Sequence, residues 1–271
     1  MRERIAFIGG GNMASAIIGG LVRQGAAACD LMVVEPSPKA RLTLQENLKV
    51  SAHSEPGDFL QQAALVVWAV KPQAFRAAAL ATQAHTPKAL HLSVAAGIRS
   101  DDIARWLKTE RVVRAMPNTP ALIGKGISAL FARSGVQAAE QRWISQVLAG
   151  TGELLWCAQE TALDAVTALS GSGPAYVFYF LEAMCEAGVG MGLSAAQAHQ
   201  LAVNTFIGAG ELARTSDLSP ATLRQQVTSQ GGTTHAALTA LENDGVKNKF
   251  IHAIQCARVR AQELGDEFGR A

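Results

Sequence analysis

The first fourteen residues constrain the fold of this chain more than any other stretch. A short apolar run from Arg4 to Ile8 leads directly into Gly9-Gly10-Gly11-Asn12-Met13-Ala14, and apolar residues at helical spacing follow as far as Gly25. This order predicts a strand, a tight G-x-G-x-x-A turn and a helix, the arrangement that binds a dinucleotide. A purely structural turn is the alternative, and the rest of the chain must decide between the two.

Each small residue of this turn has a physical role in the predicted site. Gly9 permits the tight bend, Gly11 lets the backbone approach a pyrophosphate, and Ala14 lets the helix pack closely on the strand. The start of the helix also offers free N–H groups and a partial positive charge to the phosphates. We therefore predict cofactor contacts from Gly9, Gly11, Asn12, Met13 and Ala14.

An acidic residue stands at the distance that such a site requires. Glu35 ends a second apolar run, about 20 residues past the glycine turn, where a carboxylate accepts hydrogen bonds from ribose hydroxyls. The alternative is a solvated residue at a strand end. Glu35 favours an unphosphorylated ribose, whereas Ser37, Lys39 and Arg41 favour a 2′-phosphate. The sequence therefore predicts that both NADH and NADPH are used and leaves the preference open.

Strand-like and helix-like runs alternate up to about residue 160, which is typical of parallel strands joined by crossover helices. We predict an α/β Rossmann domain over residues 1–160, with a doubly wound and mostly parallel sheet. After residue 35, the expected strands are 64–70, 89–94, 111–116, 127–132 and 152–157, and the expected helices include 41–48, 101–107 and 137–148.

Ligands bind such a sheet at the loops that follow the carboxyl ends of its strands. In this chain those loops hold small or polar residues, which also suit plain connections. Because several of these loops have the same small and polar composition, we add eight residues to the predicted cofactor site. They are Ser37, Val70, Lys71, Pro72, Ala96, Gly97, Pro117 and Asn118.

The character of the chain changes after residue 160, where the strand signal disappears. Between Asp164 and Glu211 the only charged side chains are Glu182 and Glu186. A helix in water needs a polar face, so this segment must be buried nearly all round. Glycines interrupt it before a membrane span of about 20 residues is reached. We predict that residues 161–271 form a helical substrate-binding and dimerisation domain, covered in part by a second copy.

Composition narrows the class of protein. The net charge of +2 comes without a basic cluster, which argues against nucleic acid or an anionic membrane as partner. The four cysteines are scattered and form no C-x-x-C pair, so we expect neither disulfides nor a metal site. No signal-peptide pattern precedes the first apolar run, which favours a cytoplasmic protein.

The stretch from Val227 to His235 carries a second binding signal. Two glycines and two threonines precede an apolar helical pattern, and such a nest of backbone donors holds a carboxylate. An ordinary capped loop is the alternative. Ser172-Gly173-Pro174, by comparison, is a helix start that needs no function.

At this point the sequence resembles the pyrroline-5-carboxylate reductases over its whole length. The motifs that carry the resemblance are Phe7 to Ala14, Ala69 to Gln73, Met116 to Pro120, Leu169 to Tyr176 and Val227 to Thr234. One departure is visible, because the family usually has proline where this chain has Gln230. That change makes the entry to the loop less rigid and bears on substrate affinity more than on the type of reaction.

The resemblance implies reduction of 1-pyrroline-5-carboxylate to L-proline with NADPH or NADH, the last step of proline biosynthesis. It also implies a homodimer, with a decamer of dimers as the larger form. Thr234 would be the catalytic residue, with its hydroxyl on the ring nitrogen. Gly231, Gly232 and Thr233 would bind the substrate carboxylate, together with Ser229. A protonated imine accepts hydride readily, so positioning can supply much of the catalysis.

Two other readings compete with this one. Hydroxyacid dehydrogenases share the general plan but use a lysine of the helical domain, and this chain has none between Lys125 and Lys247. A protein that binds a dinucleotide without turnover would have no reason for the loop 231–234. His235 could be considered as a proton donor, but a histidine in the first turn of a helix is more typical of a surface or capping residue.

Overall fold

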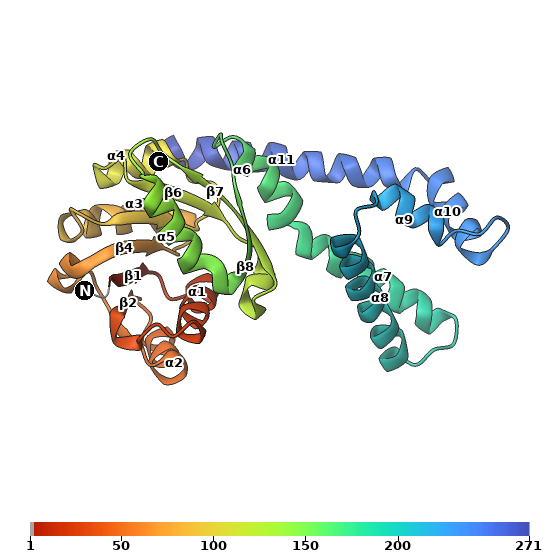
Figure 1. Ribbon diagram of the computed structural model, residues 1–271, viewed down its shortest axis with the longest axis horizontal. Helices are drawn as coiled ribbons and strands as arrows, with labels where there is room; N and C mark the ends of the chain where they lie inside the picture. The colour runs from red at the N-terminus through yellow and green to blue at the C-terminus, as the bar shows by residue number, and fades with distance from the viewer. Residues whose placement is uncertain (1–2, 271) are drawn as a thin grey trace. The chain divides into compact units, whose positions relative to one another are not determined.

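The computed structural model describes residues 3–270, and its contacts divide the chain into two compact units (Figure 1). The first unit extends to Ser172 and includes the C-terminal segment from Ala257, and the second is Gly173–Cys256. The sequence-based domains, 1–160 for the dinucleotide and 161–271 for substrate and dimerisation, were defined by function. These boundaries stay a prediction.

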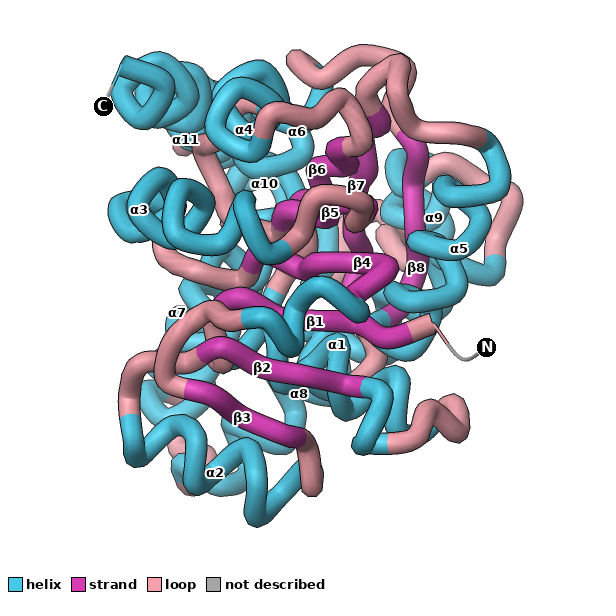
Figure 2. Tube along the Cα trace, turned by 90° about the vertical axis from the view of Figure 1, so that its left-hand side faces the viewer, coloured by secondary structure: helices cyan, strands magenta, loops and turns pink. Residues whose placement is uncertain are grey.

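The first unit is built on an eight-stranded sheet with the order β3-β2-β1-β4-β5-β6-β7-β8 (Figure 2). Neighbouring strands are parallel except β6 and β7, which run antiparallel. The Rossmann sheet predicted from the sequence is thereby confirmed. The strands are β1 (Arg4–Ile8), β2 (Leu31–Val34), β3 (Ser51–His53), β4 (Ala63–Trp68), β5 (Leu90–Ser93), β6 (Val112–Met116), β7 (Gly126–Ala132) and β8 (Gly152–Trp156).

Helices cover both faces of this sheet (Figure 2). They are α1 (Asn12–Arg23), α2 (Pro38–Leu48), α3 (Pro72–Thr82), α4 (Ser100–Leu107), α5 (Ala138–Leu148), α6 (Ala162–Val166) and the end of α11 (Val246–Arg270). Short 3-10 turns are η1 (Ala28–Asp30), η2 (Asp58–Gln62), η3 (Gln83–His85), η4 (Thr119–Ile123) and η5 (Ala149–Thr151), and η6 (Thr167–Gly171) is a π-helix.

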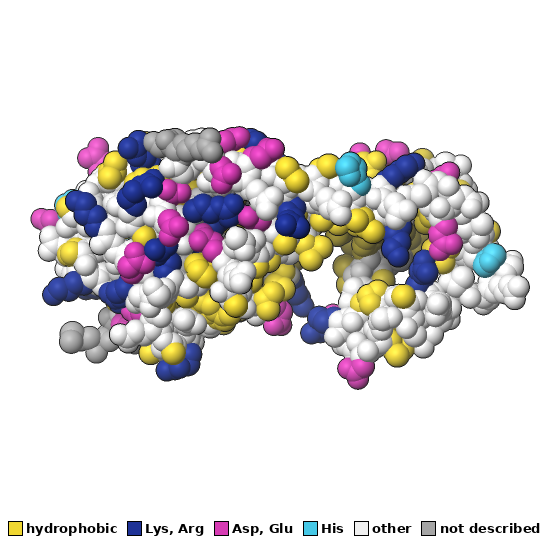
Figure 3. Space-filling view, turned by 90° about the horizontal axis from the view of Figure 1, so that it is seen from above, with side chains coloured by type: hydrophobic (Ala, Val, Ile, Leu, Met, Phe, Trp, Pro, Cys, Tyr) yellow, Lys and Arg dark blue, Asp and Glu magenta, His cyan; other side chains and the backbone are white. Residues whose placement is uncertain are grey.

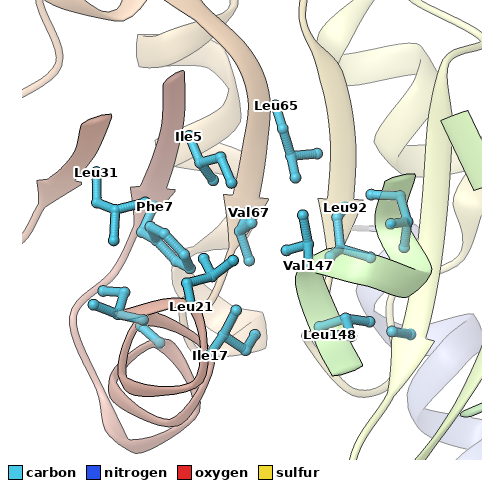
Figure 4. Packing of buried hydrophobic residues seen from close by; sticks show 14 of the residues in the cluster. Ile5, Phe7, Ile17, Leu21, Leu31, Leu65, Val67, Leu92, Val147 and Leu148 are labelled. Carbon is cyan, nitrogen blue, oxygen red and sulfur yellow. The ribbon is translucent and has the colours of Figure 1, made fainter. Parts of the chain in front are cut away.

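The core follows from the alternation of side chains along β1. Ile5 and Phe7 point to one face and belong to the core under α1 and α5. Figure 4 shows Phe7 beside Leu21 of α1, and Val147 of α5 beside Leu92 of β5. Ala6 and Ile8 point to the other face, against α3 and α4. Burying a side chain such as Phe7 stabilises the fold by roughly 1.5–3 kcal/mol. Because β1 is covered on both faces, its carboxyl end is fixed where the glycine turn begins.

The second unit consists of helices alone and keeps many apolar side chains on its surface. Its helices are α7 (Gly173–Gly190), α8 (Ala195–Thr215), α9 (Pro220–Gln226), α10 (Thr233–Asn243) and the first part of α11. Phe178 and Tyr179 of α7 are 63% and 67% exposed in the single chain, and Figure 3 shows hydrophobic side chains across this unit. Among residues 3–270, no helix has the length and apolar character of a membrane span. These apolar faces need a cover that the unit itself does not supply.

Three local features differ from the sequence-based expectation. The edge strand β3 was not predicted, because its three residues are polar or small and carry no alternating pattern. The antiparallel position of β7 was not predicted either. Only the short turn η4 connects it to β6, whereas a parallel return needs a crossover of a dozen or more residues. The strand expected at 64–70 ends at Trp68, although Ala69 N–H still donates to the Ile8 carbonyl at 2.8 Å.

His91 is a titratable side chain inside the sheet core. It is 1% exposed, and its Nδ1 accepts a hydrogen bond from Trp68 Nε1 at 3.1 Å. Burial, with a smaller contribution from the charge of Arg111, lowers the pKa of His91 from 6.5 to about 3. The imidazole is therefore neutral at physiological pH and acts as a packed hydrogen-bond acceptor.

Stability should fall as the pH is lowered from 7 to 5. Between pH 6.5 and about 3 the unfolded chain binds a proton at His91 that the folded chain does not, so the folded state loses about 1.4 kcal/mol per pH unit below 6.5. Urea unfolding at the two pH values measures this loss, about 2 kcal/mol. His91→Gln keeps an acceptor for Trp68 and does not titrate, so its stability should change less. An equal pH slope in both proteins would exclude His91 as the source.

Candidate functional site

The glycine turn after β1 has the geometry that a pyrophosphate site needs. Gly9 has a φ of 94°, and its N–H donates to the Val34 carbonyl at 2.8 Å. A Cβ at Gly9 would lie 2.6 Å from the carbonyl oxygen of Ala69, so only glycine fits. Gly11 is the N-cap of α1, and a Cβ there would meet nothing within 4 Å. The first turn of α1 is therefore open to a ligand, and Ala14 is fully buried against the sheet.

The carboxylate of Glu35 is held directly over this turn. Its Oε2 accepts from the Gly10 N–H at 2.9 Å, and its Oε1 accepts from the Ser37 N–H at 2.8 Å. A Cβ at Gly10 would lie 2.5 Å from Cδ1 of Leu44, so the middle glycine leaves room for this arrangement. Two backbone donors thus fix Glu35 at the carboxyl end of β2, where the ribose of a dinucleotide would lie.

A hollow of about 340 Å³ lies beside the glycine turn. It is lined by Gly10, Gly11, Asn12, Ser15, Ser37, Lys39, Ala40, Thr43 and Leu44. Five of these residues were not among the predicted cofactor contacts. Gly10 belongs to the turn itself, and Ser15 of α1 and Ala40, Thr43 and Leu44 of α2 line the hollow because the two helices pack side by side. The residues present fit the adenosine end of a dinucleotide, because backbone N–H groups, hydroxyls and one cation line a single recess.

Arg41 does not belong to this lining. Its Nη1 donates to the carbonyl oxygens of Glu35 and Pro36 at 2.8 and 2.7 Å. Of the two cations that the sequence offered for a 2′-phosphate, Lys39 alone lines the hollow, and Arg41 braces the backbone after β2. The hydroxyl of Ser37 caps α2 by accepting from the Ala40 N–H at 3.4 Å.

The loops after β4 and β5 continue the same edge of the sheet. Lys71 is the N-cap of α3, and Pro72 occupies its first turn. Val70 and Ala96 are half-buried. Gly97 has a φ of 74°, and a Cβ there would lie 3.2 Å from both Leu264 and Phe268 of α11. This loop is therefore pressed between the sheet and the C-terminal helix.

The loop after β6 is braced through the side chain of Asn118. Its Nδ2 donates to the Ser170 carbonyl at 3.2 Å, and its Oδ1 accepts from the Ile127 N–H at 3.0 Å. The neighbouring Pro117 is buried. The structure thus gives Asn118 a bracing role that sequence reasoning missed, and its contact with a cofactor stays a prediction.

The loop predicted to hold the substrate lies in the second unit, before α10. Gly231 has a φ of 75°, and Gly232 is the N-cap of α10. The Gly232 N–H closes the turn by donating to the Ser229 carbonyl at 3.1 Å. Thr233 and Thr234 begin the helix and are exposed. The helix start therefore offers unpaired backbone N–H groups to a ligand, whereas the Gly232 N–H is used in the turn. Contacts of this loop with the substrate carboxylate stay a prediction.

His235 lines a different hollow, of about 220 Å³, between α9 and α10. Arg224 and Glu242 line it too and form an ion pair at 3.2 Å. The His235 side chain is exposed and lies beside side chains of its own unit. That it is a surface residue rather than a proton donor stays a prediction. Within residues 3–270, no cluster of three or more His, Cys, Asp and Glu side chains is arranged to hold a metal.

Comparison with protein families divides the chain into two matches. Residues 4–97 match the family described as NADP oxidoreductase, coenzyme F420-dependent, and residues 160–264 match the family described as pyrroline-5-carboxylate reductase dimerisation. The first match covers the glycine turn and Glu35, and the second covers the loop before α10.

Full-length relatives extend the same result. The chain is 40% identical to a pyrroline-5-carboxylate reductase from Pseudomonas aeruginosa over 98% of both proteins. It is similar to the structure of a pyrroline-5-carboxylate reductase from Coxiella burnetii, with a TM-score of 0.89, 34% identity and coverage of 97% and 98%. A Plasmodium falciparum pyrroline carboxylate reductase with NADP bound gives a TM-score of 0.88 and 26% identity, with the same coverage. This chain therefore belongs to the pyrroline-5-carboxylate reductase family.

Proposed function

We propose that this chain reduces 1-pyrroline-5-carboxylate to L-proline with NADH or NADPH, as the last step of proline biosynthesis. The observation that carries the proposal is the loop before α10, where Thr233 and Thr234 present a helix start to solvent. A chain that only bound a dinucleotide would need the turn at Gly9 and not this second anion site. The relatives named above bear the same activity in their names.

The residues divide the work between binding and orientation. The open backbone at Gly11 and the start of α1 bind the pyrophosphate, and Glu35 orients the adenosine ribose. The bound dinucleotide supplies the hydride that reduces the C=N bond. The helix start at Thr233 holds the substrate carboxylate, and the Thr234 hydroxyl hydrogen-bonds the ring nitrogen as its charge changes.

The wider organisation forms part of the same proposal. Residues 1–160 bind the dinucleotide, and residues 161–271 bind the substrate and form a dimer, with a decamer of dimers as the larger assembly. The four free cysteines fit a reducing compartment, and we propose a cytoplasmic location.

Oxidation of NADH and of NADPH in the presence of 1-pyrroline-5-carboxylate tests the activity. Cofactor binding without turnover would favour the sensor reading instead.

The cofactor preference should depend on Glu35. Its fixed carboxylate repels a 2′-phosphate. Of the two cations predicted to attract that phosphate, only Lys39 lines the hollow. Both cofactors should work in the parent protein. Glu35→Ser should shift the NADPH to NADH ratio of kcat/KM toward NADPH by roughly tenfold or more, equivalent to about 1.4 kcal/mol. Glu46→Ser, the same change at an exposed position of α2, is the control. An unaltered ratio in Glu35→Ser would remove Glu35 from the cofactor site.

The hydroxyl of Thr234 should matter for turnover. Thr234→Ala should lower kcat/KM by about 10- to 100-fold, because a hydrogen bond to a charged partner contributes roughly 1.5–3 kcal/mol. The loss should be seen in kcat as well as KM, since the bond is strongest in the transition state. Thr234→Ser should recover most of the rate, and Thr239→Ala, on the same helix, serves as the control. An alanine variant as fast as the parent, or one that loses cofactor binding, contradicts this role.

The exposed face of α7 should be the dimer interface. Phe178 is 63% exposed in the single chain, so Phe178→Asp would be tolerated by a monomer but should cost several kcal/mol at an apolar interface. Phe180→Asp should also destabilise the subunit, because Phe180 packs edge-on against Phe250 at 5.4 Å between ring centroids. Leu42→Asp, at an exposed position of α2, is the control. Sedimentation of the unaltered protein as an active monomer at micromolar concentration would rule out an obligate dimer.

A further inference from the structure

An ionic cluster with two buried and two partly buried members lies behind the loop that follows β5. Arg99, at the end of this loop, donates from Nη1 and Nη2 to the two carboxylate oxygens of Asp164, at 2.9 and 3.0 Å. Asp164, on α6, is 5% exposed. Arg114 of β6, also 5% exposed, donates to Oε1 of Glu160 at 2.5 Å. The two parallel bonds between Arg99 and Asp164 fix the guanidinium and the carboxylate in direction as well as distance.

Ser100 connects the two ion pairs. Its N–H donates to Oε1 of Glu160 at 2.7 Å, and its Oγ donates to Oε2 at 2.5 Å. Ser100 follows Arg99 directly and begins α4. Both carboxylates of the segment 160–164 are therefore bonded to the end of the β5 loop, and Glu160 is bonded to β6 as well. A shift of this loop would have to break several charge-assisted bonds together.

Helix α11 closes the loop from a third side. A Cβ at Gly265 would lie 2.5 Å from Nε of Arg99, so the glycine leaves room for the guanidinium. One turn further, Phe268 lies against Gly97, whose positive φ suits glycine. The loop 95–99 is thus fixed in three ways. Glu160 connects Ser100, at its end, to Arg114 of β6, and Asp164 of α6 binds Arg99. Helix α11 packs against Gly97 and Arg99.

The carboxylates of Glu160 and Asp164 both accept hydrogen bonds from arginine side chains, and Glu160 also accepts from Ser100. Burial opposes ionisation of Glu160, yet the charge of Arg114 and the bonds from Ser100 and Arg114 lower its pKa below the usual value. Burial likewise opposes the charge of Arg99, and the bonds and charge of Asp164 raise its pKa. A buried ion pair that loses one partner leaves an uncompensated charge, so this cluster resists rearrangement.

The strand order places this loop at the nicotinamide half of a bound dinucleotide. Glu35 ends β2 and the glycine turn ends β1, so the adenosine half lies over those strands. The other half must continue along the sheet edge, over the ends of β4 and β5. The loop 95–97 is the end of β5, and an error of about 1 Å in the placement of the reacting group can cost on the order of 100-fold in rate.

We propose that Arg99 and Asp164 are positioning residues for hydride transfer, which fix the loop 95–97 against the nicotinamide ring. The inference rests on the cofactor site of the proposed function. It assigns no contact between either side chain and the substrate. Their effect passes through the backbone of the loop that they hold.

Asp164→Asn tests this directly, because it keeps the shape of the side chain and removes the charge that faces Arg99. We expect kcat to fall at least about tenfold and the affinity for NADH to fall about fivefold. ADP-ribose has the adenosine half and no nicotinamide, so calorimetry should find its affinity within about twofold of the parent value. Arg99→Lys, which keeps the charge without the fork, should retain more of the rate than Arg99→Met.

The control is Asp101→Asn on α4, which removes an 81%-exposed carboxylate that pairs with Arg133, the residue after β7. It should leave kcat and both affinities unchanged. A parent-like kcat and NADH affinity in Asp164→Asn would overturn the proposal, and so would an ADP-ribose affinity that falls as far as that for NADH. The binding comparison needs no turnover. A parent protein that is inactive with 1-pyrroline-5-carboxylate would therefore refute the proposed function and still leave the positioning role open to this test.

Discussion

The close approach of the Gly9 backbone to two neighbouring strands is the constraint on which the rest of the structure depends. Its N–H reaches the Val34 carbonyl, and its missing Cβ leaves space for Ala69. This turn can form only where β1 is buried on both faces, because packing from two sides keeps the ends of β1, β2 and β4 in register. The core therefore determines where backbone donors meet a phosphate.

Most of the first unit could be predicted from the sequence because its strands are continuous apolar runs separated by helical patterns. The prediction failed where local pattern carries little information. β3 is a short polar edge strand, and the direction of β7 follows from the short connection at η4. Local composition also offered Arg41 as a phosphate ligand, but its guanidinium is bound to the carbonyls of Glu35 and Pro36. Only tertiary packing decides which way a long side chain turns.

The candidate site was predictable where a motif implies its own geometry and was not predictable elsewhere. The backbone geometry at Gly9 and in the loop before α10 follows from turn chemistry within a few residues. The partner of Arg99 lies 65 residues away along the chain, and no spacing rule connects them. The signal available in the sequence was weaker: Arg114 lies in an otherwise apolar strand, and a buried charge requires a partner. A buried arginine predicts that an acidic side chain lies beside it, but the sequence does not show which acid this is.

The arrangement of charges suggests how a reductase can work with little acid–base chemistry. Shifted pKa values often mark the reacting groups of an enzyme. Here Arg99 and Glu160, whose pKa values shift, lie behind the loop after β5 and bond to other parts of the same unit. Hydride transfer to a protonated imine needs alignment of two carbon atoms more than it needs a proton donor. Buried ion pairs that fix a backbone loop supply alignment, whereas a single titrating side chain would not.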